Sequence, residues 1–292
     1  MFTCFEGGLD LDKLDREPFT FQHKLMQHPA LSLENLERVI PALPESHIKY
    51  SSGKLRNGDA FEAAYKTHRN GMSIDETIHT IRTSDSYIMV REPEVHASFQ
   101  ELHRELTADV AVLMRQAGWG GKVLDPRLYM FIASPGAFTP FHIDRNSTLL
   151  MQFRGRKEIA VFPAWDDDVV SAPDREDYVG YANKPLPWHE ELDPRAARFD
   201  FGPGDALHIP FLSGHYVRNS LDDVSISLSI IFNSTRTAHQ IRALGLNRRV
   251  RPLLGRLGLT PRSVGQAYWR DTVKSTLFRV GGRVGRLLGR QN

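Results

Sequence analysis

The sequence predicts a mainly β protein with flanking helices, in which a sandwich, jelly roll or barrel forms the core. Two observations carry this prediction. From residue 126 to residue 235, short runs rich in β-branched and aromatic residues alternate with Gly, Pro, Asp and Asn. In residues 1–125 and 236–292, apolar residues recur instead at steps of three and four. We therefore divide the chain into a mostly helical N-terminal part that packs on the core, a β core and a basic helical C-terminal segment.

Two helices are predicted in the N-terminal part. Ser32 precedes the apolar run of SLENLERVIPAL and suits an N-cap position. The clearest helix extends from Pro93 to Gly118, because Pro favours the first helical position and Gly favours the end of a helix. Its apolar face consists of Val95, Phe99, Leu102, Leu106, Val110 and Leu113.

The β core contains the runs RLYMFIAS, STLLMQF, KEIAVFP, RFDF, ALHIPF and VSISLSIIF. We interpret RGRK around Gly155 as a hairpin connection. In the last run Ser225, Ser227 and Ser229 alternate with apolar residues and share one face, which either lines a pocket or meets water. Residues 164–198 form a long acidic insertion, and loops of this length are often functional.

Composition restricts the classes of protein that fit this chain. Its 292 residues are 41% hydrophobic and 25% charged, which allows a sizeable core. There is no run of 18 apolar residues and no secretory signal in MFTCFEGGLDLDKLD, so we expect no membrane association. Cys4 is the only cysteine, which excludes an intrachain disulfide and Cys-rich zinc sites. A reducing, cytoplasmic setting is therefore expected.

The net charge of +2 conceals an asymmetry along the chain. From Arg236 to Asn292 there are 13 Lys or Arg and one acid, Asp271, so this segment carries +12 and the rest −10. Such a segment could contact nucleic acid or anionic lipid. It has few aromatic residues and no zinc or RNP motif, so we favour a helical dimerisation or docking segment. Its basic face would be solvated or would pack against the acidic body of its own or a partner subunit.

His142 and Asp144 in TPFHIDRN are candidate metal ligands. A His-x-Asp triplet alone is a weak signal, because about one is expected by chance in a chain of this size. In a strand, however, residues i and i+2 point to the same side, and His215 follows His142 by 73 residues in a second β-rich run. Two histidines and one carboxylate are the ligands of non-haem Fe(II) oxygenases, which keep the other positions open. His208 is the competing histidine, and His189 is more simply a solvated residue of the insertion.

The segment TPFHIDRNSTLLMQFRGRKEIAVFP, followed by GDALHIPFLSGHYVRN, resembles bacterial cupin-like JmjC (jumonji C) proteins, most closely their asparaginyl hydroxylase branch. The matching motifs span about residues 127–234. The resemblance implies a double-stranded β-helix core of the jelly-roll, cupin-like type. It implies an Fe(II)- and 2-oxoglutarate-dependent dioxygenase with His142, Asp144 and His215 as iron ligands. The implied reaction is hydroxylation of a protein or peptide side chain, with a small-molecule substrate as the alternative.

The resemblance also implies contacts with the co-substrate. Lys157 would pair with the distal carboxylate of 2-oxoglutarate, and the Thr139 hydroxyl would help to hold it. Ser229 is the nearest match to an asparagine that contacts the co-substrate in the asparaginyl hydroxylases, and Tyr129 could reach the pocket unless it is a packed core residue. Without the resemblance, Lys157 reads as a solvent-facing lysine at a hairpin edge. Asp144 favours hydroxylation or demethylation over the chemistry of related halogenases, which have a small residue at this position.

A non-catalytic cupin-like module that binds a ligand or a partner is the alternative from another functional class. In the branch that the chain resembles, helices after the β-helix form a dimer interface. We therefore expect a homodimer through the C-terminal helices. The apolar stripe that would be buried there consists of Val273, Leu277, Val280, Val284 and Leu287.

Overall fold

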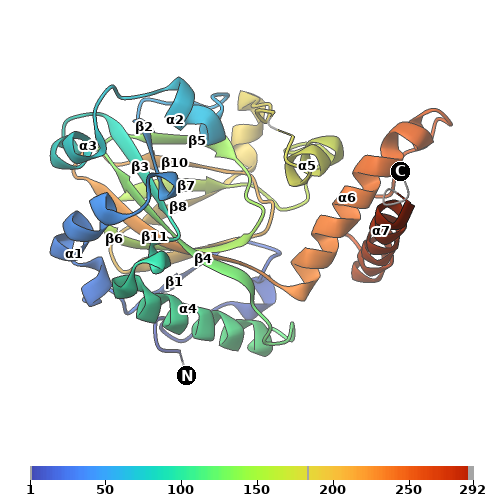
Figure 1. The fold of residues 1–292 in the computed structure, drawn as a ribbon, viewed down its shortest axis with the longest axis horizontal. Helices are drawn as coiled ribbons and strands as arrows, with labels where there is room; N and C mark the ends of the chain where they lie inside the picture. The colour runs from blue at the N-terminus through green and yellow to red at the C-terminus, as the bar shows by residue number, and fades with distance from the viewer. Residues whose placement is uncertain (1, 183, 289–292) are drawn as a thin grey trace.

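The computed structural model describes the backbone of residues 2–182 and 184–288, and the side chains among these up to residue 281. Its strands form two antiparallel sheets that face each other (Figure 1). The larger sheet has the strand order β1-β9-β6-β11-β4-β3-β2, and the smaller has the order β5-β10-β7-β8. The strands are β1 (Phe19–Gln22), β2 (Ile48–Ser52), β3 (Ser86–Arg91), β4 (Leu124–Ala133), β5 (Phe138–His142), β6 (Ser147–Arg154), β7 (Lys157–Val161), β8 (Ala197–Phe201), β9 (Asp205–Ile209), β10 (His215–Asn219) and β11 (Ser225–Asn233). Two stacked antiparallel sheets with surrounding helices confirm the predicted fold class.

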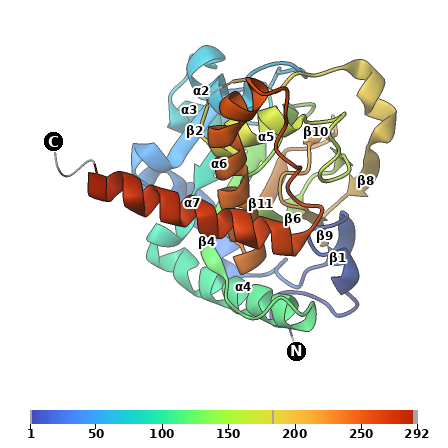
Figure 2. The same cartoon turned by 90° about the vertical axis from the view of Figure 1, so that its right-hand side faces the viewer.

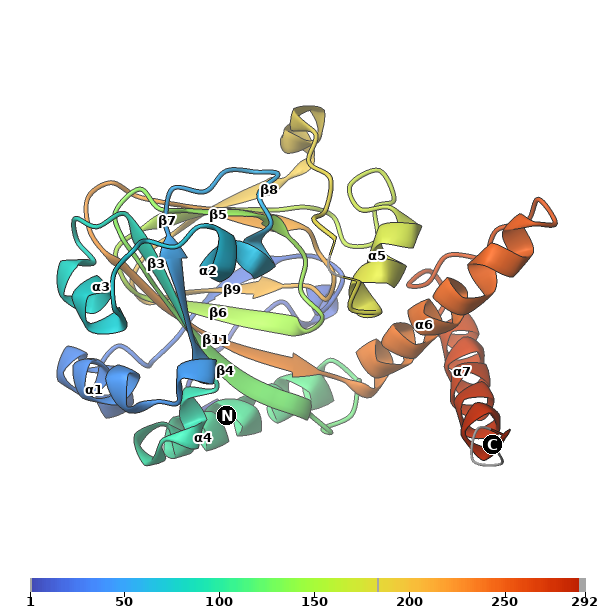
Figure 3. The same cartoon turned by 45° about the horizontal axis from the view of Figure 1, so that its top comes forward.

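The helices lie around this core, except the last two, which extend from one end of it (Figure 1). In chain order the helices are α1 (Leu33–Val39), α2 (Ala64–Thr67), α3 (Ile74–Thr80), α4 (Ala97–Gln116), α5 (Ala172–Val179), α6 (Thr235–Gly255) and α7 (Tyr268–Leu288). Helix α4 lies along the outer face of the large sheet (Figure 3). There its apolar side chains pack against residues such as Leu128 and Met130 of β4. Burying each large apolar side chain stabilises the fold by about 1.5–3 kcal/mol.

The predicted face of α4 is confirmed except at its first member. Phe99, Leu102, Leu106, Val110 and Leu113 are all buried. Val95 is exposed instead, because Pro93–Val95 forms a separate 3-10 turn and α4 begins only after its N-cap, His96. Ser32 caps α1 as predicted, with its hydroxyl accepting a hydrogen bond from the backbone of Asn35.

Residues 1–125 differ from the expectation of a mostly helical part that packs on the core. They also supply β1, β2 and β3 to the large sheet. Strand β1 pairs with β9, where Phe19 lies opposite His208, and β3 pairs with β4, where Arg91 lies opposite Tyr129. The N-terminal part is therefore built into the sheet, and it forms part of one wall of the cavity described below.

The interpretation of RGRK as a hairpin was wrong. Strand β6 belongs to the large sheet and β7 to the small one, so Gly155 lies where the chain crosses from one sheet to the other. This residue has φ of 67°, and a Cβ there would lie 2.5 Å from the carbonyl oxygen of Val224. A left-handed conformation next to another backbone segment requires glycine. The crossing places Lys157 at the first residue of β7, inside the fold.

The acidic insertion and the C-terminal helices pack against each other. The insertion contains α5 and a 3-10 helix, Glu190–Arg195, and α5 lies beside α6 (Figure 1). Arg251 of α6 makes two hydrogen bonds of 2.6 and 2.7 Å to Glu176, and Arg248 pairs with Asp177 at 2.9 Å. Part of the basic segment thus meets the acidic body of its own chain, one of the two arrangements that the charge asymmetry suggested.

Helices α6 and α7 cross each other at one end of the molecule (Figure 2). Val273, Leu277 and Val280 of α7 are all more than half exposed. The side chains of Val284 and Leu287, the other members of the predicted stripe, lie outside the described residues. No helix in the described part of the chain combines the length and the apolar character needed to cross a membrane.

Candidate metal centre and cavity

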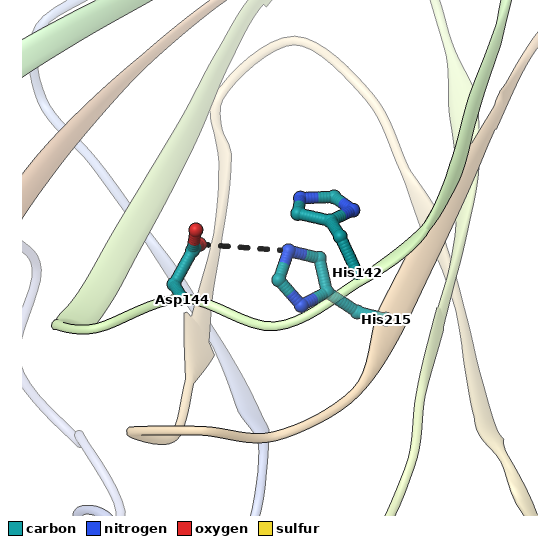
Figure 4. Close-up of side chains that lie close together, drawn as sticks. All are labelled: His142, Asp144 and His215. Carbon is teal, nitrogen blue, oxygen red and sulfur yellow. Dashed lines mark ion pairs between the residues drawn. The ribbon is translucent and has the colours of Figure 1, made fainter. Parts of the chain in front are cut away.

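Two strands of the small sheet bring the candidate metal ligands together. His142 is the last residue of β5 and His215 the first residue of β10, and the two are direct cross-strand partners. Asp144 follows β5 by two residues and turns back toward the histidines (Figure 4). The antiparallel register therefore joins residues that are 73 positions apart in the sequence.

The geometry of the three side chains suits one small cation. One ligand atom from each of His142, Asp144 and His215 lies within 4.8 Å of the others. The His215 Nε2 atom is 3.6 Å from Asp144 Oδ2, and the two imidazole centroids are 4.1 Å apart. In both histidines Nδ1 lies against a backbone carbonyl oxygen, that of Pro140 at 2.7 Å and that of Ser213 at 3.0 Å. Donation from Nδ1–H to these carbonyls fixes the tautomer and leaves each Nε2 lone pair available to a metal.

Burial keeps one of the imidazoles neutral. It lowers the pKa of His215 to about 4, and the neighbouring His142 contributes in the same direction. A neutral imidazole is the form that binds a metal. The His215 side chain is 5% exposed and that of Asp144 is 37% exposed, so the centre is reached from the carboxylate side.

The other two histidines considered from the sequence lie elsewhere. His208 is fully buried and is held on both sides, with Nδ1 against the Thr148 carbonyl and Nε2 accepting from the Asp15 backbone. Its ring packs on Phe19 of β1, so it belongs to the core around the edge of the large sheet. His189 is exposed in the insertion, as expected.

The metal centre opens into a cavity of about 760 Å³ between the two sheets. One wall is the inner face of the large sheet, and the other carries His142, His215 and Lys157. Ser225, Ser227 and Ser229 line this cavity and are buried, so the serine face of β11 is the pocket face. Thr139 lines it from β5, close to the Tyr87 hydroxyl.

Lys157 is a buried cation within this cavity. It is 7% exposed, and its ammonium group donates a hydrogen bond of 2.9 Å to Ser227 Oγ. It has no carboxylate partner among the described residues, and burial lowers its pKa to about 7. A solvent-facing lysine at a hairpin edge is thereby excluded. A buried ammonium without a counter-ion is costly, which favours an anionic ligand at this place.

Tyr129 and Ser229 lie next to each other on paired strands, but they differ in burial. Ser229 is buried in the cavity wall opposite Leu150 and Tyr129. Tyr129 is only partly buried, and its hydroxyl accepts a hydrogen bond of 3.2 Å from Arg91 Nε. Tyr129 also lines the cavity, so it does reach the pocket, where its hydroxyl is bonded to Arg91.

Three further polar residues line the cavity, Tyr87, Thr148 and Asn219. Tyr87 of β3 is buried, and that burial raises its pKa well above the usual tyrosine range. Asn219 lies opposite Lys157 in the β10–β7 pairing. Thr148 and Asn219 each have a buried oxygen without a hydrogen-bond partner in the described part of the chain. The sequence reasoning missed Tyr87, because the β-rich run SYIMV lay in a part that was interpreted as mostly helical.

Comparison with known proteins gives a family match and distant structural similarity. The model of the cupin-like domain family matches residues 32–238. A crystal structure of the Escherichia coli ribosomal oxygenase YcfD is 16% identical, over 94% of this chain and 68% of that chain, with a TM-score of 0.49. A second YcfD structure is 17% identical, over 91% of this chain, and has a TM-score of 0.47. This chain spans only 63% of that second structure's length.

A Bacillus subtilis oxalate decarboxylase structure is 20% identical over 46% of this chain and 29% of that chain, with a TM-score of 0.26. No curated protein is significantly similar to this chain in sequence. The family match covers the strands and loops that form the metal centre and the cavity. From its motifs, its two-sheet fold and this match, the chain belongs to the family of cupin-like domains.

Proposed function

We propose that this protein is an Fe(II)- and 2-oxoglutarate-dependent oxygenase that hydroxylates a side chain of a protein or peptide. One observation carries the proposal. A two-histidine, one-carboxylate cluster and a buried lysine without a carboxylate partner line the same cavity. The first is a ligand set for Fe(II), and the second is a binding site for an acid.

The ligand set fits Fe(II). His142, Asp144 and His215 would hold the ion from one side, and the remaining coordination positions would face the cavity. When bound together, Fe(II) and 2-oxoglutarate activate O2 for oxidation of a C–H bond, with release of succinate and CO2. The protein contributes the orientation of the ligands. The Pro140 and Ser213 carbonyls hold the imidazole rings by their Nδ1–H groups, so Nε2 stays directed at the ion.

The polar end of the cavity fits the distal carboxylate of 2-oxoglutarate. Lys157 supplies the positive charge, and the hydroxyls of Thr139 and Tyr87 lie near one another on the facing strands. The hydroxyl of Ser229 lines the wall between this end and the metal centre. Aromatic side chains exclude water around these groups. Phe61 lies 4.6 Å from the His142 ring and 5.8 Å from the Tyr87 ring, measured between centroids. A dry cavity strengthens the attraction between a cation and a carboxylate.

Release of succinate from 2-oxoglutarate, with Fe(II) added under air, tests this proposal directly. We expect slow succinate formation by the protein alone and faster formation with a substrate. A cupin-like module that only binds a ligand or a partner would bind metal and release no succinate. An oxygenase acting on a small molecule would also release succinate, and a panel of peptides and small acids would separate these substrate classes.

Affinity for 2-oxoglutarate is expected to fall as the pH rises above about 7. Only the protonated Lys157 attracts a carboxylate, and burial lowers its pKa to about 7. Below this pKa the cation is already present. Above it each binding event must also capture a proton, so the dissociation constant rises by up to ~10-fold per pH unit. Calorimetric titration of the Mn(II)-loaded protein would measure this. A Lys157→Arg variant stays charged and should show a flatter profile, so equal slopes for both proteins would contradict the prediction.

We also propose a homodimer that the C-terminal helices hold together. Val273, Leu277 and Val280 form an exposed apolar stripe on α7 with exposed fractions of 52%, 55% and 52%. A two-fold contact is the commonest way to bury such a stripe.

Light scattering is expected to give a dimer for the intact chain, and monomers for a Leu277→Glu variant and for a chain that ends near Leu259. A monomeric intact chain would contradict the proposal. DNA binding by such a monomer, with a steep dependence on salt, would favour the nucleic-acid alternative.

The remaining expectations fit this function. We propose that residues 126–235 carry the chemistry, that residues 1–125 complete one cavity wall, and that residues 236–292 serve assembly.

Cys4 is buried, and that burial raises the pKa of its thiol to about 12. A thiol that stays protonated is inert, in keeping with the cytoplasmic setting that we propose.

A further inference from the structure

Lys49 on β2 and Arg91 on β3 place two positive charges on the cavity wall. Both line the cavity, and both are half-buried. Lys49 lies opposite Met89 in the β2–β3 pairing, so Lys49 and Arg91 are diagonal neighbours with backbones about 7–8 Å apart. Neither forms an ion pair with a carboxylate of the described residues. Like charges side by side in a partly desolvated wall repel each other, so an anion bound between them would relieve an unfavourable arrangement.

Aromatic rings hold both cations in place. The Arg91 guanidinium donates from Nε to the Tyr129 hydroxyl at 3.2 Å, and its two NH2 groups have no hydrogen-bond partner among the described residues. The Lys49 ammonium lies 4.5 Å from the Tyr65 ring centroid, and Lys66 lies 5.4 Å from the same centroid on the exposed side. A guanidinium that is fixed at one edge presents its other donors in a rigid fork, which suits a carboxylate or a phosphate.

Apart from the exposed Lys66, the other cations on the cavity lining are already neutralised or otherwise assigned. Arg127 pairs with Glu92 at 3.2 Å, and Arg145 pairs with Glu62 at 3.1 Å. Lys184 pairs with Asp177 at 2.9 Å. Lys157 donates to Ser227 of β11, which is three strands away from β2 in the large sheet. Lys49 and Arg91 are therefore not part of an internal ion-pair network.

One chain of contacts joins Lys49 to the metal ligands, and a second joins Arg91 to the cavity wall. Phe61 packs on the His142 ring, and Tyr65, one helical turn further along, packs on Lys49. Across the large sheet, Arg91 pairs with Tyr129, and Tyr129 pairs with Ser229 of the cavity wall. The helical turn between Phe61 and Tyr65 places the Lys49 cation on the order of 10 Å from His142.

We propose that Lys49 and Arg91 bind an oxyanion of the molecule that the enzyme oxidises, a carboxylate or a phosphate on the order of 10 Å from the oxidised carbon. This proposal rests on the proposed oxygenase function and names a chemical class within it. In an extended peptide, an acidic residue about three positions from the target residue fits this spacing. The surface between the two sites is largely apolar and aromatic, with Tyr87, Met89 and Phe131.

Binding of three small probes to the Zn(II)-loaded protein tests this inference. N-oxalylglycine, an unreactive 2-oxoglutarate analogue, is added first so that Lys157 is occupied. The probes are 3-phenylpropanoate, its neutral partner 3-phenylpropanamide, and phenyl phosphate, followed by ligand-observed NMR. We expect at least one of the two anions to bind about 10-fold or more tightly than the amide, because hydrogen bonds to a charged group contribute strongly. A preference for one anion identifies carboxylate or phosphate as the natural group.

The double variant Lys49→Gln/Arg91→Gln should lose this preference, whereas Arg127→Gln, which removes a neutralised cation, should keep it. Lys49→Arg and Arg91→Lys retain the charge, and they keep the test decisive if the double variant does not fold. Equal binding of all three probes by the unchanged protein would overturn the proposal, as would a preference that survives the double substitution. The assay needs no turnover. Succinate release is measured separately on the same proteins, so failure of the oxygenase function and failure of the anion site are distinguishable.

Discussion

Replacement of His142 or Asp144 by Ala is expected to abolish Fe(II)-dependent succinate formation and to weaken metal binding by ~100-fold or more. Loss of a partner behind a metal ligand typically costs 10–100-fold in affinity, and loss of the ligand itself costs more. The ligand atoms of His142, Asp144 and His215 lie within 4.8 Å of one another, so removal of one leaves a two-ligand site. Metal content after anaerobic reconstitution and calorimetric titration with Fe(II) would measure the loss.

A matched control separates this effect from a general change in the protein. His189 is exposed in the insertion, and His189→Ala should leave both metal content and succinate formation unchanged. Thermal unfolding of the variants without metal would show whether the fold persists. One iron per chain in both His142→Ala and Asp144→Ala would refute the assignment of the metal centre.

Replacement of Lys157 by Met is expected to raise the Michaelis constant for 2-oxoglutarate by about 10- to 100-fold, with Fe(II) affinity nearly unchanged. A hydrogen bond to a charged group contributes roughly 1.5–3 kcal/mol, which corresponds to this range. Methionine keeps most of the volume of the lysine side chain in the cavity, so packing changes little. The hydroxyl of Ser227, which now accepts from the ammonium group, would lose that partner.

The control for this variant is Lys54→Met, which removes an exposed lysine that is paired with Asp85. Its 2-oxoglutarate kinetics should match those of the unchanged protein. Titration with 2-oxoglutarate in a succinate assay, together with Fe(II) binding in the absence of co-substrate, would separate the two affinities. If Lys157→Met left the response to 2-oxoglutarate unaltered, another group would have to bind the distal carboxylate.

Local patterns in the sequence predicted two kinds of feature. These are residues that are close to each other in the sequence, and helices in which a periodic pattern continues over many residues. The face of α4 followed from apolar residues at steps of three and four over about five turns. The convergence of His142 and Asp144 followed from their spacing of two residues at the end of a strand. His215 was added as the third candidate ligand because it lies in a second β-rich run, and the family resemblance implied the same set of three.

Short strands with distant partners could not be predicted in the same way. Strands β1, β2 and β3 are four to six residues long, and runs of that length show too few periods to separate strand from helix. Their sheet partners also lie far along the chain, as with Phe19 opposite His208. For this reason Tyr87, Lys49 and Arg91 were not recognised as residues of a cavity wall.

By itself, the sequence determined which residues share a face and which residue types could hold a metal and an acid. The tertiary structure decided which face is inside. Alternation along β11 placed Ser225, Ser227 and Ser229 together, but a period of two is the same whether that face meets water or a cavity. The crossing at Gly155 decided that Lys157 enters the space between the sheets, where it is buried against Ser227. The physical reason is that side-chain direction is a local property of the backbone, whereas burial depends on a second sheet whose position no local pattern specifies.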